Sequence, residues 1–291
     1  DLPMFNISRL GDALGAEITG ITLGDLDDTG IETLKAALFE HNVVCIRNQH
    51  DFTPEQHIAL TKRLGEIHEY VLNNYCLPNH PEILVLSNEI DEQGRAIGVK
   101  DGAQYWHTDT SYEKRPLWFS ILRAIKLPEK DGTTLGDTLF ASTAAAYDAL
   151  SDDMKNKLEG LKNVHSYNTY TKVRQGREKV RGKLTQEQID KTPDRIQPVI
   201  RTHPANGRKC LFVNEGYSIK ICDLPEGESE DLLEELFKHI KNPKFTYRHH
   251  WQPGDVLIWD NPQTQHCAIG DYDVPLTRTM YRTATRGPIP I

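Results

Sequence analysis

The chain has 291 residues, of which 26% are charged and 38% apolar, with a formal net charge of −8 and a sequence pI of about 5.8. This length can bury a sizeable core, and all-β sandwiches or barrels often reach it as one domain. The acidic balance argues against nucleic acid or a membrane surface as the main partner, although a few buried arginines can still form a pocket for a small anion. No run approaches the roughly 18 apolar residues of a membrane span.

The sequence shows no signal for export or for disulfide bonding. The N-terminal stretch DLPMFNISRLGD lacks a basic region followed by an apolar one, so no secretory signal is predicted. The cysteines are dispersed without a C-x-x-C pair, which is typical of reduced thiols. They are Cys45, Cys76, Cys210, Cys222 and Cys267. We therefore predict a cytoplasmic protein and leave its oligomeric state open, a homo-oligomer included.

The first half of the chain contains both helix and strand patterns. Thr53, Pro54 and Gln56 form a capping-box signature, which predicts a helix that ends near Gly65. The apolar run 43–46 predicts a buried strand. Further helices are predicted over 31–41, 142–150 and from Ser151 to Gly160, and further strands over 83–86 and 118–125.

The last third of the chain is richer in strands. Strand candidates lie at 211–213, 245–251, 256–259 and 276–285, with one helix predicted over 231–240. Residues 89–104 are polar and contain glycine, which predicts a loop, and the highly charged residues 171–195 predict a solvated excursion. Because no repeat or linker divides the chain, we expect one domain over 1–291. Its fold should be mainly β with flanking helices, either a β-sandwich or an open barrel.

The segment from Tyr105 to Thr110 carries a candidate metal-binding pair. His107 and Asp109 are two residues apart, so on a strand both side chains point to the same face. An imidazole and a carboxylate side by side are two ligands of the 2-His-1-carboxylate triad, which leaves metal positions open in non-haem Fe(II) oxygenases. Taken alone, H-x-D is a weak signal, and a hydrogen-bonded histidine near an aspartate is the more common explanation.

A third ligand and an anion site are suggested farther along the chain. His266 follows the predicted apolar strand 256–259 and its polar turn. Arg278 and Arg282 are four residues apart and share one face of the next predicted strand. Guanidinium groups on a half-buried strand need anions, and arginine matches a carboxylate with two hydrogen bonds. The combination of H-x-D, a later histidine and an arginine twelve residues beyond it is far more specific than its parts.

With these residues in place, the chain resembles the taurine dioxygenase and 2,4-dichlorophenoxyacetate dioxygenase family over nearly its whole length. The matching stretches are LGAEI at 14–18, WHTD at 106–109, GDTLF at 136–140, AAY at 145–147, RTHP at 201–204, FVNEG at 212–216, WDN at 259–261 and residues 278–285. The resemblance implies a double-stranded β-helix, or jelly roll, and iron ligation by His107, Asp109 and His266.

The same resemblance implies the cofactor and the reaction. Arg278 and Thr138 are expected to hold the distal carboxylate of 2-oxoglutarate, with Fe(II) and O2 as the other requirements. Arg282 falls where the family places an arginine that meets the anionic group of the prime substrate. The expected reaction is the hydroxylation of a small organic anion, a sulfonate, carboxylate or sulfate ester, coupled to the release of succinate and CO2.

Departures from the family pattern bear on the substrate. Taurine-specific members carry a histidine where this chain has Tyr70, and an asparagine where it has Ala103. The aromatic residue after Asn-Glu-Gly is kept as Tyr217. We therefore predict that Arg282, Tyr70 and Tyr217 contact a small anion other than taurine. Substrate choice is expected to depend on loops near 66–76, 89–104 and 166–180.

Two other classes of protein fit part of the pattern. A zinc hydrolase also uses two histidines and one aspartate, but it leaves Arg278 and Thr138 without a role. A non-catalytic jelly-roll binding module would make the triad accidental. Succinate formed from 2-oxoglutarate with Fe(II), compared with Zn(II), distinguishes the three.

Overall fold

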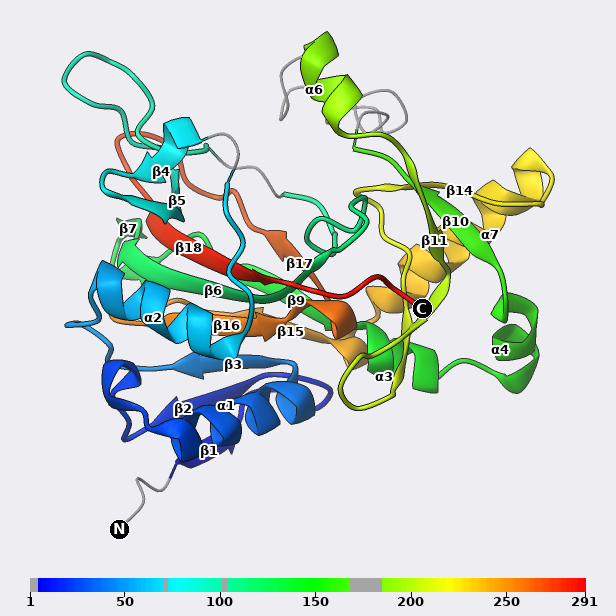
Figure 1. The fold of residues 1–291 in the computed structure, drawn as a ribbon, viewed down its shortest axis with the longest axis horizontal. Helices are drawn as coiled ribbons and strands as arrows, with labels where there is room; N and C mark the ends of the chain where they lie inside the picture. The colour runs from blue at the N-terminus through cyan, green and yellow to red at the C-terminus, as the bar shows by residue number, and fades with distance from the viewer. Residues whose placement is uncertain (1–4, 71–72, 101–103, 168–184) are drawn as a thin grey trace.

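A sheet of eight strands forms the centre of the molecule in the computed structural model, which describes residues 5–70, 73–100, 104–167 and 185–291 (Figure 1). The strand at residues 16–19 is parallel to the strand at 43–46, and all other neighbouring pairs in this sheet are antiparallel. The order is β1 (Asn6–Arg9), β2 (Ala16–Thr19), β3 (Val43–Ile46), β16 (Val256–Asp260), β6 (Leu117–Lys126), β18 (Thr279–Arg286), β5 (His80–Ser87) and β4 (Cys76–Leu77).

A smaller sheet faces the inner side of this large one. It consists of β15 (Thr246–His249), β9 (Thr138–Ser142) and β17 (Thr264–Ala268), in that order. Phe140 of β9 meets Trp259 of β16 with ring centroids 5.5 Å apart, and both belong to one buried cluster. The space between the two sheets is therefore a packed core that opens toward the site described below.

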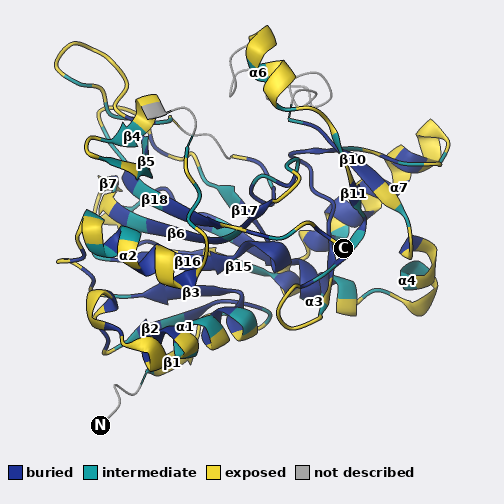
Figure 2. Cartoon of the chain, in the orientation of Figure 1, coloured by how far each residue is buried: buried dark blue, intermediate teal, exposed yellow. Residues whose placement is uncertain are grey.

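Two helices cover the outer side of the large sheet. Helices α1 (Asp28–His41) and α2 (Pro54–Leu64) pack Leu34 and Leu60 into a buried cluster that includes Ile258 of β16. Alternate residues of β16 and β6 thus enter the outer and inner cores, which is the period-2 pattern of a strand buried on both faces. Figure 2 shows the central strands buried and the outer faces of the helices exposed.

The remaining elements form a second packed region beside the two sheets (Figure 1). Helix α7 (Glu226–Ile240) is its largest helix. Its strands are β10 (Lys162–His165), β11 (Arg195–Pro198), β12 (Ile200–Thr202), β13 (Lys209–Leu211) and β14 (Ser218–Ile221), and its shorter helices are α3 (Thr143–Asp148) and α4 (Asp152–Leu158). Helix α6 (Gln186–Lys191), β7 (Glu129–Lys130), β8 (Thr133–Thr134) and the 3-10 turns η1 (Leu23–Asp25), η2 (Asn73–Tyr75), η3 (Pro243–Phe245) and η4 (Asn261–Gln263) are peripheral or connecting elements.

The prediction of a mainly β fold with helices is confirmed. The capping box of α2 is present as expected, with Thr53 and Gln56 bonded to each other's backbone N–H groups. Several boundaries were wrong: α1 begins at Asp28, where Asp27 caps it, α7 begins at Glu226, and the strands expected over 211–213 and 276–285 are Lys209–Leu211 and Thr279–Arg286. Helix α6 was not predicted, and the rest of that charged stretch before residue 185 lies outside the described residues.

Candidate active site

A pair of backbone hydrogen bonds joins the two candidate histidines. His107 N donates to His266 O over 3.1 Å, and His266 N donates to His107 O over 2.9 Å. His107 therefore forms an isolated bridge and does not belong to a strand, so the predicted strand over the H-x-D segment is wrong. His266 lies in the middle of β17 and not in a turn. Directly opposed residues of such a bridge project to the same face, and the two imidazole centroids lie 4.2 Å apart.

A buried asparagine fixes the position of Asp109. Asn261 of η4 accepts a hydrogen bond from Asp109 N over 2.9 Å and donates to Asp109 O over 3.0 Å. The same amide nitrogen donates to Leu117 O over 2.8 Å. Asp109 lies in a turn, so its position is fixed by these contacts and not, as expected from the sequence, by the hydrogen bonds of a strand. The WDN stretch at 259–261 is thus part of the site, a role that its apolar surroundings alone did not predict.

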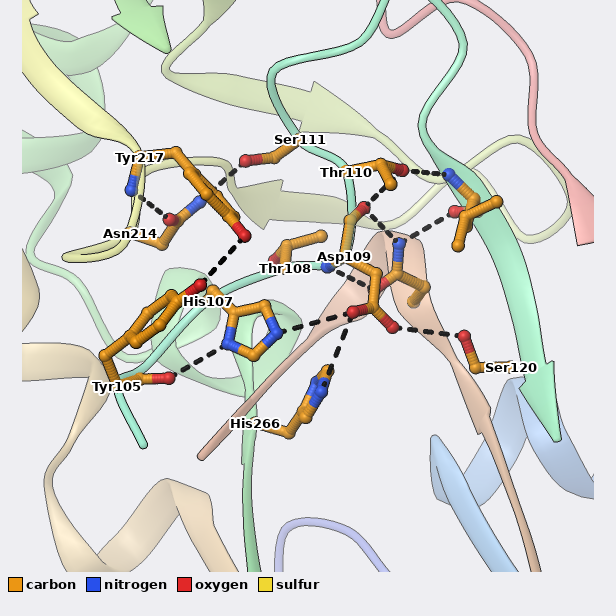
Figure 3. Close-up of polar contacts among 12 residues, drawn as sticks. Tyr105, His107, Thr108, Asp109, Thr110, Ser111, Ser120, Asn214, Tyr217 and His266 are labelled. Carbon is orange, nitrogen blue, oxygen red and sulfur yellow. Dashed lines mark hydrogen bonds and ion pairs between the residues drawn. The ribbon is translucent and has the colours of Figure 1, made fainter. Parts of the chain in front are cut away.

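The two histidines and the aspartate converge on one point (Figure 3). Asp109 Oδ1 lies 3.4 Å from His107 Nε2 and 3.7 Å from His266 Nε2. All three side chains are buried. His107 Nδ1 lies 2.9 Å from Tyr105 O, which makes it a donor and leaves Nε2 as a lone-pair donor toward the cluster.

This donor set fits a divalent transition metal. Two nitrogens and one oxygen about 2.1 Å from one ion at right angles would be separated by about 3 Å, slightly less than the observed spacings. The ligand atoms all lie within 4.8 Å of one another. Two imidazoles and a carboxylate on one side of an ion leave its other positions open, as in non-haem Fe(II) oxygenases. His107, Asp109 and His266 could therefore hold Fe(II).

The protonation states of His266 and Asp109 suit metal binding. Burial, and next the neighbouring His107, lower the pKa of His266 to about 3, so its imidazole is neutral near pH 7. Burial alone would raise the pKa of Asp109, but Arg282, followed by His266 and His107, holds it well below its usual range. A neutral imidazole and an ionised carboxylate are the forms that bind a metal.

The triad opens into a cavity of about 250 Å³ that also contains both predicted arginines and Thr138. Thr138 of β9 accepts a hydrogen bond from Trp251 Nε1 over 3.1 Å, and the Arg278 guanidinium lies 5.7 Å from the centroid of the Trp251 ring. Gly136 allows this close packing, because a Cβ there would come within 2.9 Å of Arg278 Cδ. A larger surface hollow of about 410 Å³ lies elsewhere and contains none of these residues.

Arg282 is nearer to the metal ligands than the sequence suggested. Its Nη2 donates to Asp109 Oδ2 over 2.6 Å and to Ser120 Oγ over 3.2 Å. Its Nε is buried and has no hydrogen-bond partner among the described residues, and the same holds for Tyr70 Oη. Both residues line the cavity. Burial raises the pKa of Tyr70 to about 12, so its hydroxyl remains a donor.

Tyrosines form the wall of the cavity beside His107. Tyr217 Oη lies 3.1 Å from Tyr105 Oη, and the Tyr217 ring lies 4.7 Å from that of Tyr112. Tyr167 packs on Tyr112 at 4.8 Å. The three stretches expected to govern substrate choice all reach the cavity, through residues that include His68, Tyr70, Val99 and Tyr167. Ala103 lies outside the described residues.

Several residues of this site were given no role from sequence. Trp251 and Trp259 were given no role in the site, yet the guanidinium of Arg278 lies 5.7 Å from the centroid of the first ring and that of Arg282 5.8 Å from the centroid of the second. Ser120 was also missed, although the alternation of β6 places it on the same inward face as Leu122. Side-chain alternation along β6, which pairs with β18, would have identified Ser120 as a residue that points toward the site.

The chain matches the family described as "Taurine catabolism dioxygenase TauD, TfdA family" over residues 6–284. It belongs to this family. It is 32% identical over 277 residues to the pentalenolactone F synthase of Streptomyces avermitilis, covering 90% of this chain and 88% of that one. It is 30% identical over 286 residues to the (S)-phenoxypropionate/alpha-ketoglutarate-dioxygenase of Sphingobium herbicidovorans, covering 98% and 96%.

A solved structure of a taurine dioxygenase from Burkholderia xenovorans has a similar fold, with a TM-score of 0.80 and 30% sequence identity. The comparison covers 99% of this chain and 93% of that chain. The chain is accordingly an Fe(II)- and 2-oxoglutarate-dependent dioxygenase. This outcome confirms the predicted class and cofactors, and it disfavours both the zinc hydrolase and the non-catalytic binding module. No helix in the described ranges combines the length and apolar character needed to cross a membrane.

The triad predicts three inactive variants. His107→Ala, His266→Ala and Asp109→Asn should each abolish succinate release with Fe(II), because each alanine removes a ligand nitrogen and asparagine replaces a carboxylate ligand with a neutral amide. Asparagine is chosen at 109 because it keeps the size of the side chain and an acceptor oxygen, whereas alanine would leave Arg282 buried with no partner at that position, at a cost of about 3–5 kcal/mol. Succinate formation and the melting temperature are to be measured together.

His250→Ala is the matched control, since this histidine has 74% of its side chain exposed. Its turnover should equal that of the wild type. Near-normal activity in any triad variant would remove that residue from the metal site. Turnover of the wild type with Zn(II) in place of Fe(II) would contradict the oxygenase chemistry.

Proposed function

We propose that this dioxygenase hydroxylates a small organic anion other than taurine, a sulfonate, carboxylate or sulfate ester with an apolar or aromatic body. The observation that carries the proposal is that Arg282 and Tyr70, two residues that line the cavity with the triad, each keep a buried donor, Nε and Oη, without a hydrogen-bond partner among the described residues. Unsatisfied buried donors are costly, and one anionic oxygen or two would satisfy both. The names of the relatives cover several different substrates, so the cavity itself must indicate the substrate class.

The assignment of the metal and co-substrate residues supports this proposal. His107, Asp109 and His266 would hold Fe(II), which together with 2-oxoglutarate supplies the activation of O2 and the oxidising power. Arg278 and Thr138 would bind the distal carboxylate of 2-oxoglutarate, the guanidinium as a charged donor and the hydroxyl as a second donor. Both line the cavity, Thr138 from the start of β9 and Arg278 from the residue directly before β18.

The tyrosine wall suits an apolar body. Tyr112, Tyr167 and Tyr217 present contiguous rings, and Leu84 and Leu86 line the cavity as well. Aromatic side chains bury a large area at little entropic cost, while a guanidinium fixes the orientation of an anion. The substrate carbon nearest the anion would then face the triad. If that carbon carries a heteroatom leaving group, its hydroxylation releases a carbonyl compound and the anion.

The exclusion of taurine rests on the donor beside Arg282. Tyr70 offers a hydroxyl where taurine-specific members offer an imidazole, and it packs at 4.9 Å against the ring of His68. Burial, and next the nearby Arg282, lower the pKa of His68 to about 4, so it adds no positive charge near pH 7. The pocket therefore offers one cation and a bulky phenol, which favours a longer, less polar anion than taurine.

The architecture and location complete the proposal. The two facing sheets would form a double-stranded β-helix, and residues 1–291 would form one domain, which accords with a family match over residues 6–284. All five cysteines are free, which is typical of a reducing cytoplasm, the proposed location.

A substrate panel tests the substrate class. Arylsulfonates, aryloxyalkanoates, alkyl sulfates and taurine are offered at equal concentration, and succinate release coupled to product formation is measured. We expect the anions with apolar bodies to be turned over at least tenfold more efficiently than taurine. Efficient turnover of taurine, or of a neutral or cationic analogue, would contradict the proposal.

Arg278→Ala tests the co-substrate site. Loss of a charged, hydrogen-bonded partner costs about 2–5 kcal/mol, so the KM for 2-oxoglutarate should rise at least tenfold. Arg248→Ala is the control, because this arginine is 51% exposed and pairs with Asp137 outside the cavity. An unchanged KM in Arg278→Ala would transfer the role to Arg282.

Tyr70→Phe tests the anion site more cleanly than a change of Arg282, which also holds Asp109. Loss of one hydroxyl bonded to an anion costs about 1.5–3 kcal/mol, so the KM for the prime substrate should rise about tenfold or more. The KM for 2-oxoglutarate should stay the same. Equal changes in both constants, or in neither, would remove Tyr70 from substrate recognition.

A further inference from the structure

The two oxygens of Asp109 face different partners. Oδ1 faces His107 and His266, whereas Oδ2 faces away from them (Figure 3). Oδ2 accepts a hydrogen bond from Ser120 Oγ over 3.1 Å and another from Arg282 Nη2 over 2.6 Å. One oxygen of the carboxylate is thus occupied by the protein while the other is presented to the metal site.

The direction of these hydrogen bonds follows from the chemistry of the donors. A guanidinium nitrogen can only donate, so in its contact with Arg282 over 3.2 Å the Ser120 oxygen is the acceptor. The single hydroxyl hydrogen of Ser120 then remains available for Asp109 Oδ2. Ser120 Oγ, Arg282 Nη2 and Asp109 Oδ2 therefore form a closed triangle of three hydrogen bonds.

The backbone of Ser120 is held in place by its strand neighbours. It is fully buried in the middle of β6, where its register partners are Trp259 of β16 and Ala284 of β18. A strand paired on both sides has little freedom to shift, and the short serine side chain has one torsion to orient the hydroxyl. Among the described residues, the Ser120 side chain forms hydrogen bonds with Asp109 and Arg282 alone.

We propose that Ser120 is a positioning residue that keeps Asp109 a ligand through Oδ1 alone. The inference rests on the proposed metal triad and deepens it. A carboxylate with both oxygens unoccupied can bind a metal through both and take up an additional position. With Oδ2 held by two donors, Asp109 would offer a metal ion Oδ1 alone, and the position that a second oxygen could take would stay open.

Ser120 has a function that Arg282 cannot supply alone. Arg282 is also the proposed partner of the substrate anion, so its guanidinium responds to the presence of substrate. Ser120 does not touch the substrate side and holds Oδ2 whether the substrate is present or not. Ser120 would thereby keep Asp109 Oδ2 occupied independently of the substrate.

The test is the affinity of the apoprotein for Mn(II), measured by calorimetric titration, because Mn(II) binds such sites and does not oxidise in air. Groups that orient metal ligands typically contribute 10–100-fold to affinity, and we expect Ser120→Ala to bind Mn(II) about tenfold more weakly. Ser120→Thr keeps the hydroxyl and should restore most of the affinity. The melting temperatures of the apoproteins are compared in parallel.

Ser229→Ala is the matched control. Ser229 is equally buried, in α7, and its hydroxyl accepts from Ile221 N over 2.8 Å, remote from the triad. It should leave the Mn(II) affinity unchanged. If Ser120→Ala does not fold, Ser120→Cys, of similar size and a weak donor, takes its place with the same expected loss.

Three results are decisive and distinct. Weaker Mn(II) binding in Ser120→Ala with an unchanged melting temperature, restored by Ser120→Thr, supports the proposal. Unchanged Mn(II) affinity in a folded Ser120→Ala or Ser120→Cys overturns it while leaving the triad intact. Wild-type Mn(II) binding that survives in His107→Ala overturns the proposed metal site itself, and the role of Ser120 with it.

Discussion

The site depends on the two backbone hydrogen bonds between His107 and His266. Residues 104–111 form no strand, so their path would otherwise be that of a loop. The bridge ties this segment to the middle of β17, which is itself paired along its whole length with β9. Two imidazoles that are distant in sequence are thereby brought to opposed positions of an antiparallel pair, and their side chains must share a face. Residues 104–111 are thus fixed by the sheet that contains β17, although they form no strand themselves.

The second constraint is that every buried charge must be compensated. Asp109 is buried and ionised, and burial alone would favour its neutral form. Arg282, followed by His266 and His107, keeps the carboxylate of Asp109 in its charged form, and Ser120 donates a further hydrogen bond to the oxygen that Arg282 contacts. The same contacts determine which oxygen can reach a metal. The contacts that keep Asp109 ionised in the interior are therefore the same contacts that orient its carboxylate toward the candidate metal site.

Much of this was predictable from sequence because strands and ligands follow short-range patterns. The capping box at Thr53, the apolar run 43–46 and the inward spacing of Arg278 and Arg282 each depend on residues within a few positions. The pairing of Arg282 with Asp109 was not predictable, because it depends on the distance between β18 and a turn, which no local pattern contains.

The residues around the site also differ in whether local sequence could have placed them. Tyr105, Tyr112 and Tyr167 come from irregular segments, and their convergence on Tyr217 follows from how those segments cross. Side-chain alternation cannot place such residues. Ser120 is the opposite case: it lies on a regular strand, and its inward direction follows directly from its neighbours.

The charges of the cavity bear on the charge of the substrate. Near pH 7 the two arginines and a bound Fe(II) carry four positive charges, while Asp109 and the two carboxylates of 2-oxoglutarate carry three negative ones. His68 and His266 are neutral, since burial lowers their pKa values to about 4 and about 3, and Tyr70 remains protonated. One positive charge is left in a cavity where an uncompensated charge is costly. A substrate with one negative charge neutralises the site, whereas a dianion leaves one negative charge to be desolvated. The same charge balance that keeps Asp109 ionised therefore favours a monoanion whose remaining surface is apolar.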